Sequence, residues 1–166
     1  MMASFTIDRC DIFLPPSTMF LDTCVLFSAF FPDDSFHRDA LDFIREDHPL
    51  LVPYIVLGEA WGLLVGSRRR PDCGVKMLTF LRERPNTQFV PVWSDIYQQT
   101  RDLCSKHRID LVDALLMCMS SSCTRLSKLK SPIPIVTYDT RDFARCYGAV
   151  SFGCFDLRDR CLLWEN

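Results

Sequence analysis

Met19-Phe-Leu-Asp22, followed directly by Thr23-Cys-Val-Leu-Phe27, is the stretch that sets the fold: a short apolar run ends in an acid, and a segment of helical periodicity follows it. The same alternation continues along the chain. Five strands are expected, at 19–22, 50–53, 88–92, 133–137 and 149–152. Helices are expected at 24–31, 37–47, 54–67, 73–84, 94–107, 111–124 and 141–147. Strands separated by helices predict an α/β fold, with a five-stranded parallel sheet and helices on both of its faces.

The chain has 166 residues, which is the usual size of one domain, and no linker divides it. Residues 1–18 are weakly patterned and end in Pro15-Pro16-Ser17-Thr18, which cannot continue a helix. We therefore expect an N-terminal arm at 1–18 and a single domain at 19–166. Ser94 and Asp110 stand in front of helical patterns, and each is expected to cap the helix that follows it.

The composition excludes a disordered chain, because 48% of the residues are hydrophobic and only 24% are charged. The nine cysteines form no C-x-x-C pair, so neither a zinc site nor a disulfide framework is indicated. Several of them, including Cys24, lie in apolar runs, where a free cysteine acts as a small core residue. Free thiols favour a reducing cytoplasm. No apolar run approaches the roughly 20 residues of a membrane span.

Three glycines, Gly58, Gly62 and Gly66, recur every four residues within the predicted helix 54–67 and so share one face of it. Each costs a helix about 1 kcal/mol relative to alanine. We therefore expect something to approach that face closely, either another part of this chain or a second subunit.

Acidic residues follow two of the predicted strands at the point where each strand ends. Asp22 ends the first apolar run, Asp139 follows the run at 133–137, and Asp142 comes three residues later. In a parallel α/β sheet, ligands bind outside the carboxyl ends of the strands. Asp139 and Asp142 also suit a turn and a helix start, so their role is open on this pattern alone.

Two more acids interrupt apolar helical segments. Glu59 lies within 54–65, and Asp113 lies within 109–119. A buried carboxylate is costly unless it is paired, protonated or bound to a cation. A solvated position for Glu59 and a helix start for Asp110 and Asp113 are the alternatives.

If Asp22, Glu59, Asp113 and Asp139 converge, up to four negative charges share one site, and they cannot all stay ionised without compensation. An all-oxygen ligand set suits Mg²⁺ or Mn²⁺. The three histidines, His37, His48 and His107, lie in polar stretches without ligand spacing and are expected at the surface. One or two hard cations could activate water for phosphodiester hydrolysis.

Four segments, taken in order, resemble the motifs of the PIN-domain nuclease family, especially the single-domain VapC-type toxins. They are Asp22-Thr-Cys-Val-Leu, Val56-Leu-Gly-Glu59, Leu111-Val-Asp113-Ala-Leu-Leu, and Ile135-Val-Thr-Tyr-Asp139-Thr-Arg-Asp142-Phe. Each motif is weak alone, but the ordered set is specific. The resemblance covers about residues 18–156. It implies a Rossmann-like sheet of five parallel strands and metal-dependent cleavage of RNA.

The resemblance also implies roles for the matching residues. Asp22 and Asp113 would bind the principal Mg²⁺ or Mn²⁺ ion, and Glu59 and Asp139 would complete its coordination directly or through water. Asp142 would support these ligands from outside or bind a second ion. The hydroxyls of Thr23 and Thr137 would support the site. A small antitoxin protein is the implied partner, and a homodimer is a further expectation.

Two segments depart from the family pattern. One is the arm at 1–18, and the other is a polar, basic insertion from Ser120 to Pro134 that carries Arg125, Lys128 and Lys130. For RNA phosphates we consider Arg68, Arg69, Arg70 and Arg141, with a solvated helix end as the alternative for the first three.

Rival functions depend on the same acids. A PIN-fold module could bind RNA or protein without cleaving. A haloacid-dehalogenase-type phosphotransferase needs a second Asp two residues after the first, where this chain has Cys24, and a receiver domain needs a paired acid and a Lys that are missing. The net charge of −2 does not argue against RNA: without the five proposed site acids, 21 − 5 = 16 acids face 19 basic residues, a balance of +3.

Overall fold

The computed structural model describes residues 15, 17–127, 129 and 131–164. Six strands form one sheet in the order β3-β2-β1-β4-β5-β6. They are β1 (Met19–Leu21), β2 (Leu50–Pro53), β3 (Thr87–Val90), β4 (Pro134–Thr137), β5 (Gly153–Asp156) and β6 (Cys161–Trp164). The first five strands are mutually parallel, as predicted. The sixth was not predicted, and it runs antiparallel to β5 at the edge of the sheet.

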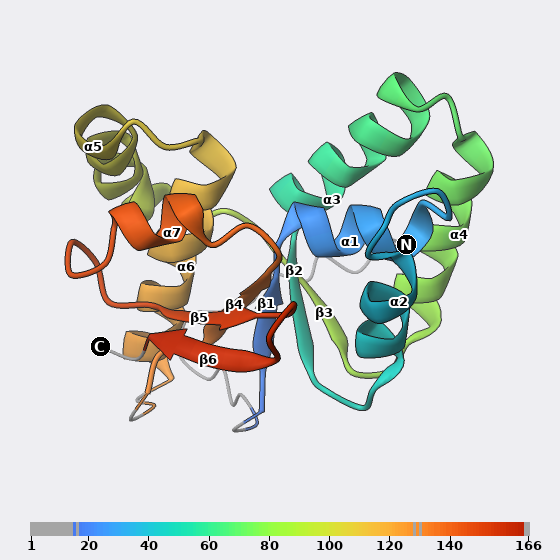
Figure 1. The fold of residues 1–166 in the computed structure, drawn as a ribbon. Helices are drawn as coiled ribbons and strands as arrows, with labels where there is room; N and C mark the ends of the chain where they lie inside the picture. Colours follow the sequence, from blue (N-terminus) through green and yellow to red (C-terminus); the bar gives the residue numbers. More distant parts are fainter. Residues whose placement is uncertain (1–14, 16, 128, 130, 165–166) are drawn as a thin grey trace, which may run out of the picture.

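The helices gather in two groups that flank the sheet (Figure 1). One group holds α1 (Thr23–Phe30), α2 (His37–Arg45), α3 (Tyr54–Trp61) and α4 (Pro71–Glu83), with a π-helical continuation of α3 called η1 (Gly62–Ser67). The other group holds η2 (Ser94–Ile96), α5 (Tyr97–His107), α6 (Leu111–Leu126) and α7 (Arg141–Arg145). The prediction of an α/β domain is thus confirmed.

The two central strands, β1 and β4, bring distant acids to one edge of the sheet. Phe20 pairs with Ile135 and Leu21 pairs with Val136, so both strands end at the same level. The backbone N–H of Asp22 continues this pairing by donating to the carbonyl of Val136 at 3.1 Å. Apolar side chains fill these strands, and Phe20, Leu21, Ile135 and Val136 have no exposed surface. The acids therefore project from a rigid, fully buried pair of strands.

The last parallel strand lies four residues beyond its predicted position of 149–152. Val150 and Phe152 of that run are buried, but they belong to the segment that leads into β5. The strand begins at Gly153, which faces Pro134 in β4. A Cβ atom at residue 153 would lie 3.1 Å from the Cα of Pro134, so glycine is what allows the two strands to approach.

Helix capping was predicted correctly at one of two positions. The Asp110 carboxylate accepts the backbone N–H of Val112 at 2.8 Å and caps α6. Ser94 caps nothing: it is the first residue of η2, where Trp93 holds the capping position without a side-chain hydrogen bond. The reason is that residues 94–96 form a separate 3₁₀ turn before α5 begins.

The predicted insertion at 120–134 is wrong in its first half, because α6 continues to Leu126. Ser120 is fully buried and donates from its hydroxyl to the carbonyl of Ile133 at 2.6 Å. Thr124 accepts the backbone N–H of Ile133 at 3.0 Å. These two hydroxyls of α6 form hydrogen bonds with the backbone of Ile133, just before β4. The polar residues in this part of the sequence therefore make contacts within the protein. Lys128 and Lys130 lie outside the described residues, as do residues 1–14 and 16 of the predicted arm.

Candidate metal centre

Asp22 lies at the centre of the site, directly after β1, and only 5% of it is exposed. Its Oδ1 accepts the backbone N–H of Thr23 at 2.6 Å, which starts α1. Its Oδ2 accepts the Thr137 hydroxyl at 2.6 Å and the Cys24 thiol at 3.0 Å. Burial raises the pKa of Asp22, while these hydrogen bonds lower it in part and the charge of Asp139 adds to the rise.

Thr137, at the end of β4, is buried and connects two of the predicted site acids. Besides donating to Asp22, its Oγ1 accepts the backbone N–H of Asp139 at 2.9 Å. The hydroxyl therefore fixes the carboxylate of one acid and the backbone of the other. These contacts place Thr137 where the predicted supporting role requires it, and the role itself stays a prediction.

Glu59 reaches the site from α3, although the residue is exposed. The Thr23 hydroxyl donates to Glu59 Oε2 at 2.5 Å and so joins the start of α1 to α3. The same threonine thus contacts Asp22 through its backbone and Glu59 through its side chain. Thr23 was predicted to support the site, and the contact gives that role a specific form.

Asp113 lies in the first turn of α6, close to several other carboxyl groups. Burial is the main cause that raises its pKa to about 8. Neighbouring carboxylates raise it further, in decreasing order Asp22, Asp142, Asp110 and Glu59. The residue thus lies within electrostatic reach of three other predicted site acids. The alternative of a simple helix start does not account for this crowding, since a lone first-turn acid is stabilised by the helix dipole.

Asp139 and Asp142 are exposed more than Asp22, and each already has an arginine partner. Asp139 binds Arg141 in a bidentate pair, with Nε–Oδ1 and Nη2–Oδ2 distances of 2.9 and 2.6 Å. The Arg141 side chain holds the pKa of Asp139 below its usual range. Asp142 Oδ1 accepts Arg145 Nη1 at 2.9 Å across the first turns of α7. The Arg145 contact was not predicted.

The five predicted acids therefore lie around one site, but they are not arranged as a closed ligand cage. No group of three or more His, Cys, Asp or Glu side chains within the described ranges stands close enough together to hold a metal ion. The chemistry of the donor set nevertheless fits a hard divalent cation. Asp22 is buried and Asp113 is half-buried, and no cationic side chain among the described residues pairs with either carboxyl group. Carboxylate oxygens are the ligands that Mg²⁺ and Mn²⁺ prefer.

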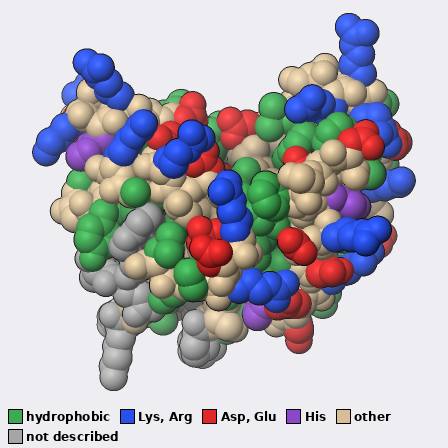
Figure 2. Space-filling view, viewed as in Figure 1, with side chains coloured by type: hydrophobic (Ala, Val, Ile, Leu, Met, Phe, Trp, Pro, Cys, Tyr) green, Lys and Arg blue, Asp and Glu red, His purple; other side chains and the backbone are tan. Residues whose placement is uncertain are grey.

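The surface around the site combines both signs of charge. Figure 2 shows acidic side chains in the hollow between the two raised groups of helices, with Lys and Arg side chains on both rims. Such a surface would repel a polyanion at its floor unless bound cations neutralise the acids, while its rims attract phosphates.

The three consecutive arginines after η1 have separate contacts. Arg68 lies over the rings of Phe27 and Phe31, 5.8 and 5.3 Å from their centroids. Arg70 pairs with Asp72 at 3.1 Å. Arg69 is exposed and has a positive φ of 55°. Two of the three predicted phosphate contacts thus carry a structural role as well.

The glycine face of α3 and η1 is open, contrary to the expectation of close packing within the chain. A Cβ atom at Gly58, Gly62 or Gly66 would meet nothing within 4 Å. The close approach between these segments occurs instead at Gly74 of α4, where a Cβ atom would lie 2.7 Å from Val65 Cγ2 and 3.0 Å from the Trp61 ring. Contact with a second subunit remains as the prediction for this face.

The three histidines lie at the surface but are partly buried. The ring of His48 stacks on Phe43 at 5.6 Å, and His37 contacts the Ser28 carbonyl at 3.0 Å. The Nε2 atom of His107 is buried. Aromatic and backbone contacts, which polar sequence context does not reveal, account for the burial.

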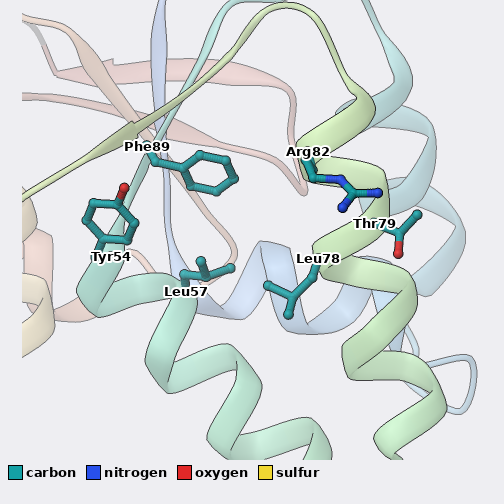
Figure 3. Close-up of a pocket in the computed structure, with 6 residues that line it drawn as sticks. All are labelled: Tyr54, Leu57, Leu78, Thr79, Arg82 and Phe89. Carbon is teal, nitrogen blue, oxygen red and sulfur yellow. The ribbon is translucent and has the colours of Figure 1, made fainter. Parts of the chain in front are cut away.

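An apolar pocket of about 370 Å³ lies between α3, α4 and the edge strand β3 (Figure 3). Its lining residues are Tyr54, Leu57, Leu78, Thr79, Arg82 and Phe89. None of them is a predicted site residue, and the pocket offers a single charged group. It is therefore a poor candidate for phosphodiester chemistry.

The PIN domain family model matches residues 19–149. The chain belongs to the PIN domain family. The match includes β1 to β4 and all five predicted site acids of this PIN domain, and it ends before β5 and β6. No curated protein sequence matches the chain.

Solved structures of similar fold include several toxin proteins. VapC20 of Mycobacterium tuberculosis, described as a sarcin-ricin loop cleaving toxin, aligns with a TM-score of 0.60 and 21% identity over 76% of this PIN domain chain and 93% of its own. FitAcB of Neisseria gonorrhoeae aligns with a TM-score of 0.58 and 16% identity, over 84% of this chain and 98% of its own. VapBC2 of Rickettsia felis, bound to a promoter DNA fragment, aligns with a TM-score of 0.56 and 15% identity, over 77% of this chain and 92% of its own. At these identities the similarity establishes the fold.

One residue of the site was missed by sequence reasoning. Cys24 was interpreted as a core residue of an apolar run, yet its Sγ contacts Asp22, Thr137 and the backbone N–H of Tyr138. Its position two residues after Asp22, on the first turn of the helix that starts at the acids, is the signal that could have identified it.

Proposed function

We propose that this PIN domain is a metal-dependent endoribonuclease that hydrolyses RNA phosphodiester bonds. The observation that supports the proposal most directly is the elevated pKa of Asp113, about 8, caused by burial and by the surrounding carboxylates. Carboxyl groups held close together away from water lower the free energy of unfolding if no cation compensates their charge. A site for a divalent cation explains why the charges are kept together.

In this proposal Asp22 and Asp113 hold Mg²⁺ or Mn²⁺, and Glu59 and Asp139 contribute directly or through water. When bound, the cation would supply an activated water molecule and stabilise charge on the scissile phosphate. Thr137 and Thr23 keep the carboxylates of Asp22 and Glu59 in position by the hydrogen bonds described above. Asp142, at the start of α7, lies close enough to add negative charge beside Asp113, and in this proposal it supports the ligands from outside or binds a second ion.

Basic side chains on the rims would hold the RNA backbone. Arg141 is suited to this role because its side chain is 82% exposed and lies beside Asp139, so it could exchange the carboxylate for a phosphate. Arg69 is exposed at the turn after η1. Arg68 and Arg70 are weaker candidates because of their contacts with rings and with Asp72.

Incubation of the full chain with RNA and Mn²⁺ tests the proposal. Wild type should cleave, addition of a chelator should stop cleavage, and Asp22→Asn should lose at least about a hundredfold in rate, since it removes a metal-binding charge. Asp42→Asn, on an exposed position of α2, is the matched control and should behave as wild type. Equal rates for wild type and Asp22→Asn would show that the mechanism is wrong.

A PIN-fold module that binds RNA or protein without cleavage is the second candidate. It is favoured by the Asp139–Arg141 pair, which engages one predicted ligand, and by the open arrangement of the acids. RNA retention without cleavage at saturating Mn²⁺ would support this candidate over the first.

We further propose that a small antitoxin is the partner, because solved structures of similar fold include VapBC2 and a toxin-antitoxin complex from Klebsiella pneumoniae. A homodimer through the open face of Gly58, Gly62 and Gly66 is proposed as well. Purification from the native host should yield a second small protein and a mass above 19.2 kDa per particle. Gly62→Leu should lower that mass if the face is a subunit contact, and an unchanged mass would exclude it.

We place the chain in the cytoplasm as part of the same proposal. All cysteines among the described residues are free thiols, which is typical of a reducing compartment. Separately, none of the helices in the described part of the chain combines the length and apolar character that a membrane span requires.

A further inference from the structure

Cys24 is held by three groups at the carboxyl ends of β1 and β4. Its Sγ lies 3.0 Å from Asp22 Oδ2, 3.3 Å from the backbone nitrogen of Tyr138 and 3.3 Å from Thr137 Oγ1. The thiol therefore connects the first turn of α1 to the residue after β4. A cysteine that only fills space in the core needs no such contacts.

The protons available to this group decide which contacts are hydrogen bonds. The backbone N–H of Tyr138 must donate to Sγ, so the single thiol proton is free to point at Asp22 Oδ2. The Thr137 hydroxyl proton also points at Oδ2, over a shorter distance of 2.6 Å. The Sγ–Oγ1 contact between Cys24 and Thr137 then carries no proton. Both side chains therefore donate their protons to the same oxygen of Asp22, Oδ2.

A count of lone pairs shows what this does to Asp22. A carboxylate offers about four acceptor positions, two on each oxygen. Thr137 and Cys24 occupy both positions on Oδ2, and the N–H of Thr23 occupies one on Oδ1. The position left for a cation is on Oδ1.

We propose that Cys24 is a positioning residue for Asp22: its thiol, together with Thr137, saturates Oδ2 and directs Oδ1 toward the cation of the proposed metal site. The inference rests on the proposed function and deepens it, because it assigns the ligand atom. Loss of the thiol leaves Oδ2 with a vacant acceptor position, so the carboxylate is no longer held in one orientation. Changes to groups that orient a metal ligand typically weaken metal binding by about 10-fold to 100-fold.

Mn²⁺ titration of the full chain without RNA, with free Mn²⁺ followed by electron paramagnetic resonance, tests the inference. Cys24→Ala should weaken Mn²⁺ binding about tenfold. Cys24→Ser keeps a donor at this position and should stay within about twofold of wild type. Cys123→Ala is the matched control: it removes a buried thiol of α6 whose pKa is raised, to about 12, by burial alone, and it should leave the affinity unchanged.

RNA kinetics give a second readout. Cys24→Ala should lower kcat while the KM for RNA stays unchanged, because the thiol acts on the cation ligand and not on the RNA. If Cys24→Ala does not fold, Cys24→Val fills the volume without a donor and takes its place against Cys24→Ser. Wild-type affinity in the non-donating variant, or equal losses in the Ser and non-donating variants, would overturn the positioning role alone. Failure of wild type to bind Mn²⁺ would overturn the proposed function instead.

Discussion

Four acids of the site fall into two regions that shift the pKa of a carboxyl group in opposite directions. Asp22 and Asp113 are largely enclosed by the protein, and the pKa of each is raised, with burial as the main cause in both cases. Asp139 and Asp142 lie at the surface on the segment after β4, and arginines neutralise both. Here the pKa of Asp139 is lowered, mainly by Arg141.

This difference in burial and in arginine partners indicates which carboxyl groups need a bound cation. Exposed carboxylates with a guanidinium partner are satisfied without one, and such surface pairs contribute at most about 1 kcal/mol. Buried carboxylates that face other carboxylates are not satisfied, and they must be protonated or compensated. A cation should therefore act mainly through the buried pair, and the exposed pair should modulate it.

The largest expected effect comes from removing the charge of Asp113. Its folded-state pKa of about 8 lies above the ordinary value of 3.8, so the folded state binds more protons between these two values. The free energy of unfolding should consequently fall as pH rises across that window. Asp113→Asn should remove this fall and, at pH 8 and without metal, stabilise the protein by up to about 5 kcal/mol. Thermal unfolding at pH 5 and pH 8 in a chelator measures both.

Mn²⁺ provides the control for that experiment. At about 100 times its Kd it should stabilise wild type by about 2.7 kcal/mol at pH 8. It should add little to Asp113→Asn, which lacks the charge. If the Asn variant and wild type lose stability with pH in parallel, the buried pair does not carry the strain assigned to it.

The smallest expected effect comes from the exposed pair. Arg141→Ala should leave the free energy of unfolding almost unchanged, because the Arg141 side chain is 82% exposed and water screens its ion pair with Asp139. It should also tighten Mn²⁺ binding slightly by freeing Asp139, and raise the KM for RNA by removing a phosphate contact. Chemical denaturation, Mn²⁺ titration and cleavage kinetics measure the three quantities.

Arg145→Ala is the matched control, since it breaks the corresponding pair with Asp142 at a side chain that is 56% exposed. It should share the small effect on stability and leave the KM for RNA near the wild-type value. A change in the free energy of unfolding as large as that expected for Asp113→Asn would remove the distinction between the two regions.

Much of the architecture could be predicted from local pattern. The first four predicted strands overlap β1 to β4, since an apolar run that ends in an acid or proline has few alternatives in an α/β chain. β6 escaped prediction because Cys161–Trp164 is short and pairs antiparallel with the neighbouring β5, so no helix separates the two strands as in the rest of the chain. The open face at Gly58, Gly62 and Gly66 escaped as well. Helical spacing shows which residues share a face but not what the face meets.

The sequence by itself determined the α/β class, the order of the four motifs and the identity of the acids, because these depend on periodicity and on side-chain chemistry that stays the same in any environment. Only the tertiary structure decided which acids are strained. Asp22 and Asp113 differ from Asp139 and Asp142 mainly through burial, which chain segments distant in sequence set. The arginines that pair with Asp139 and Asp142 are local, because Arg141 and Arg145 stand two and three residues after them. Cys24 belongs to the same category as Asp22 and Asp113. Its spacing of two residues from Asp22 marks the cysteine as close to the acid, but Thr137 and Tyr138 come from a segment more than a hundred residues away, so only the tertiary structure shows how the thiol is held against Asp22.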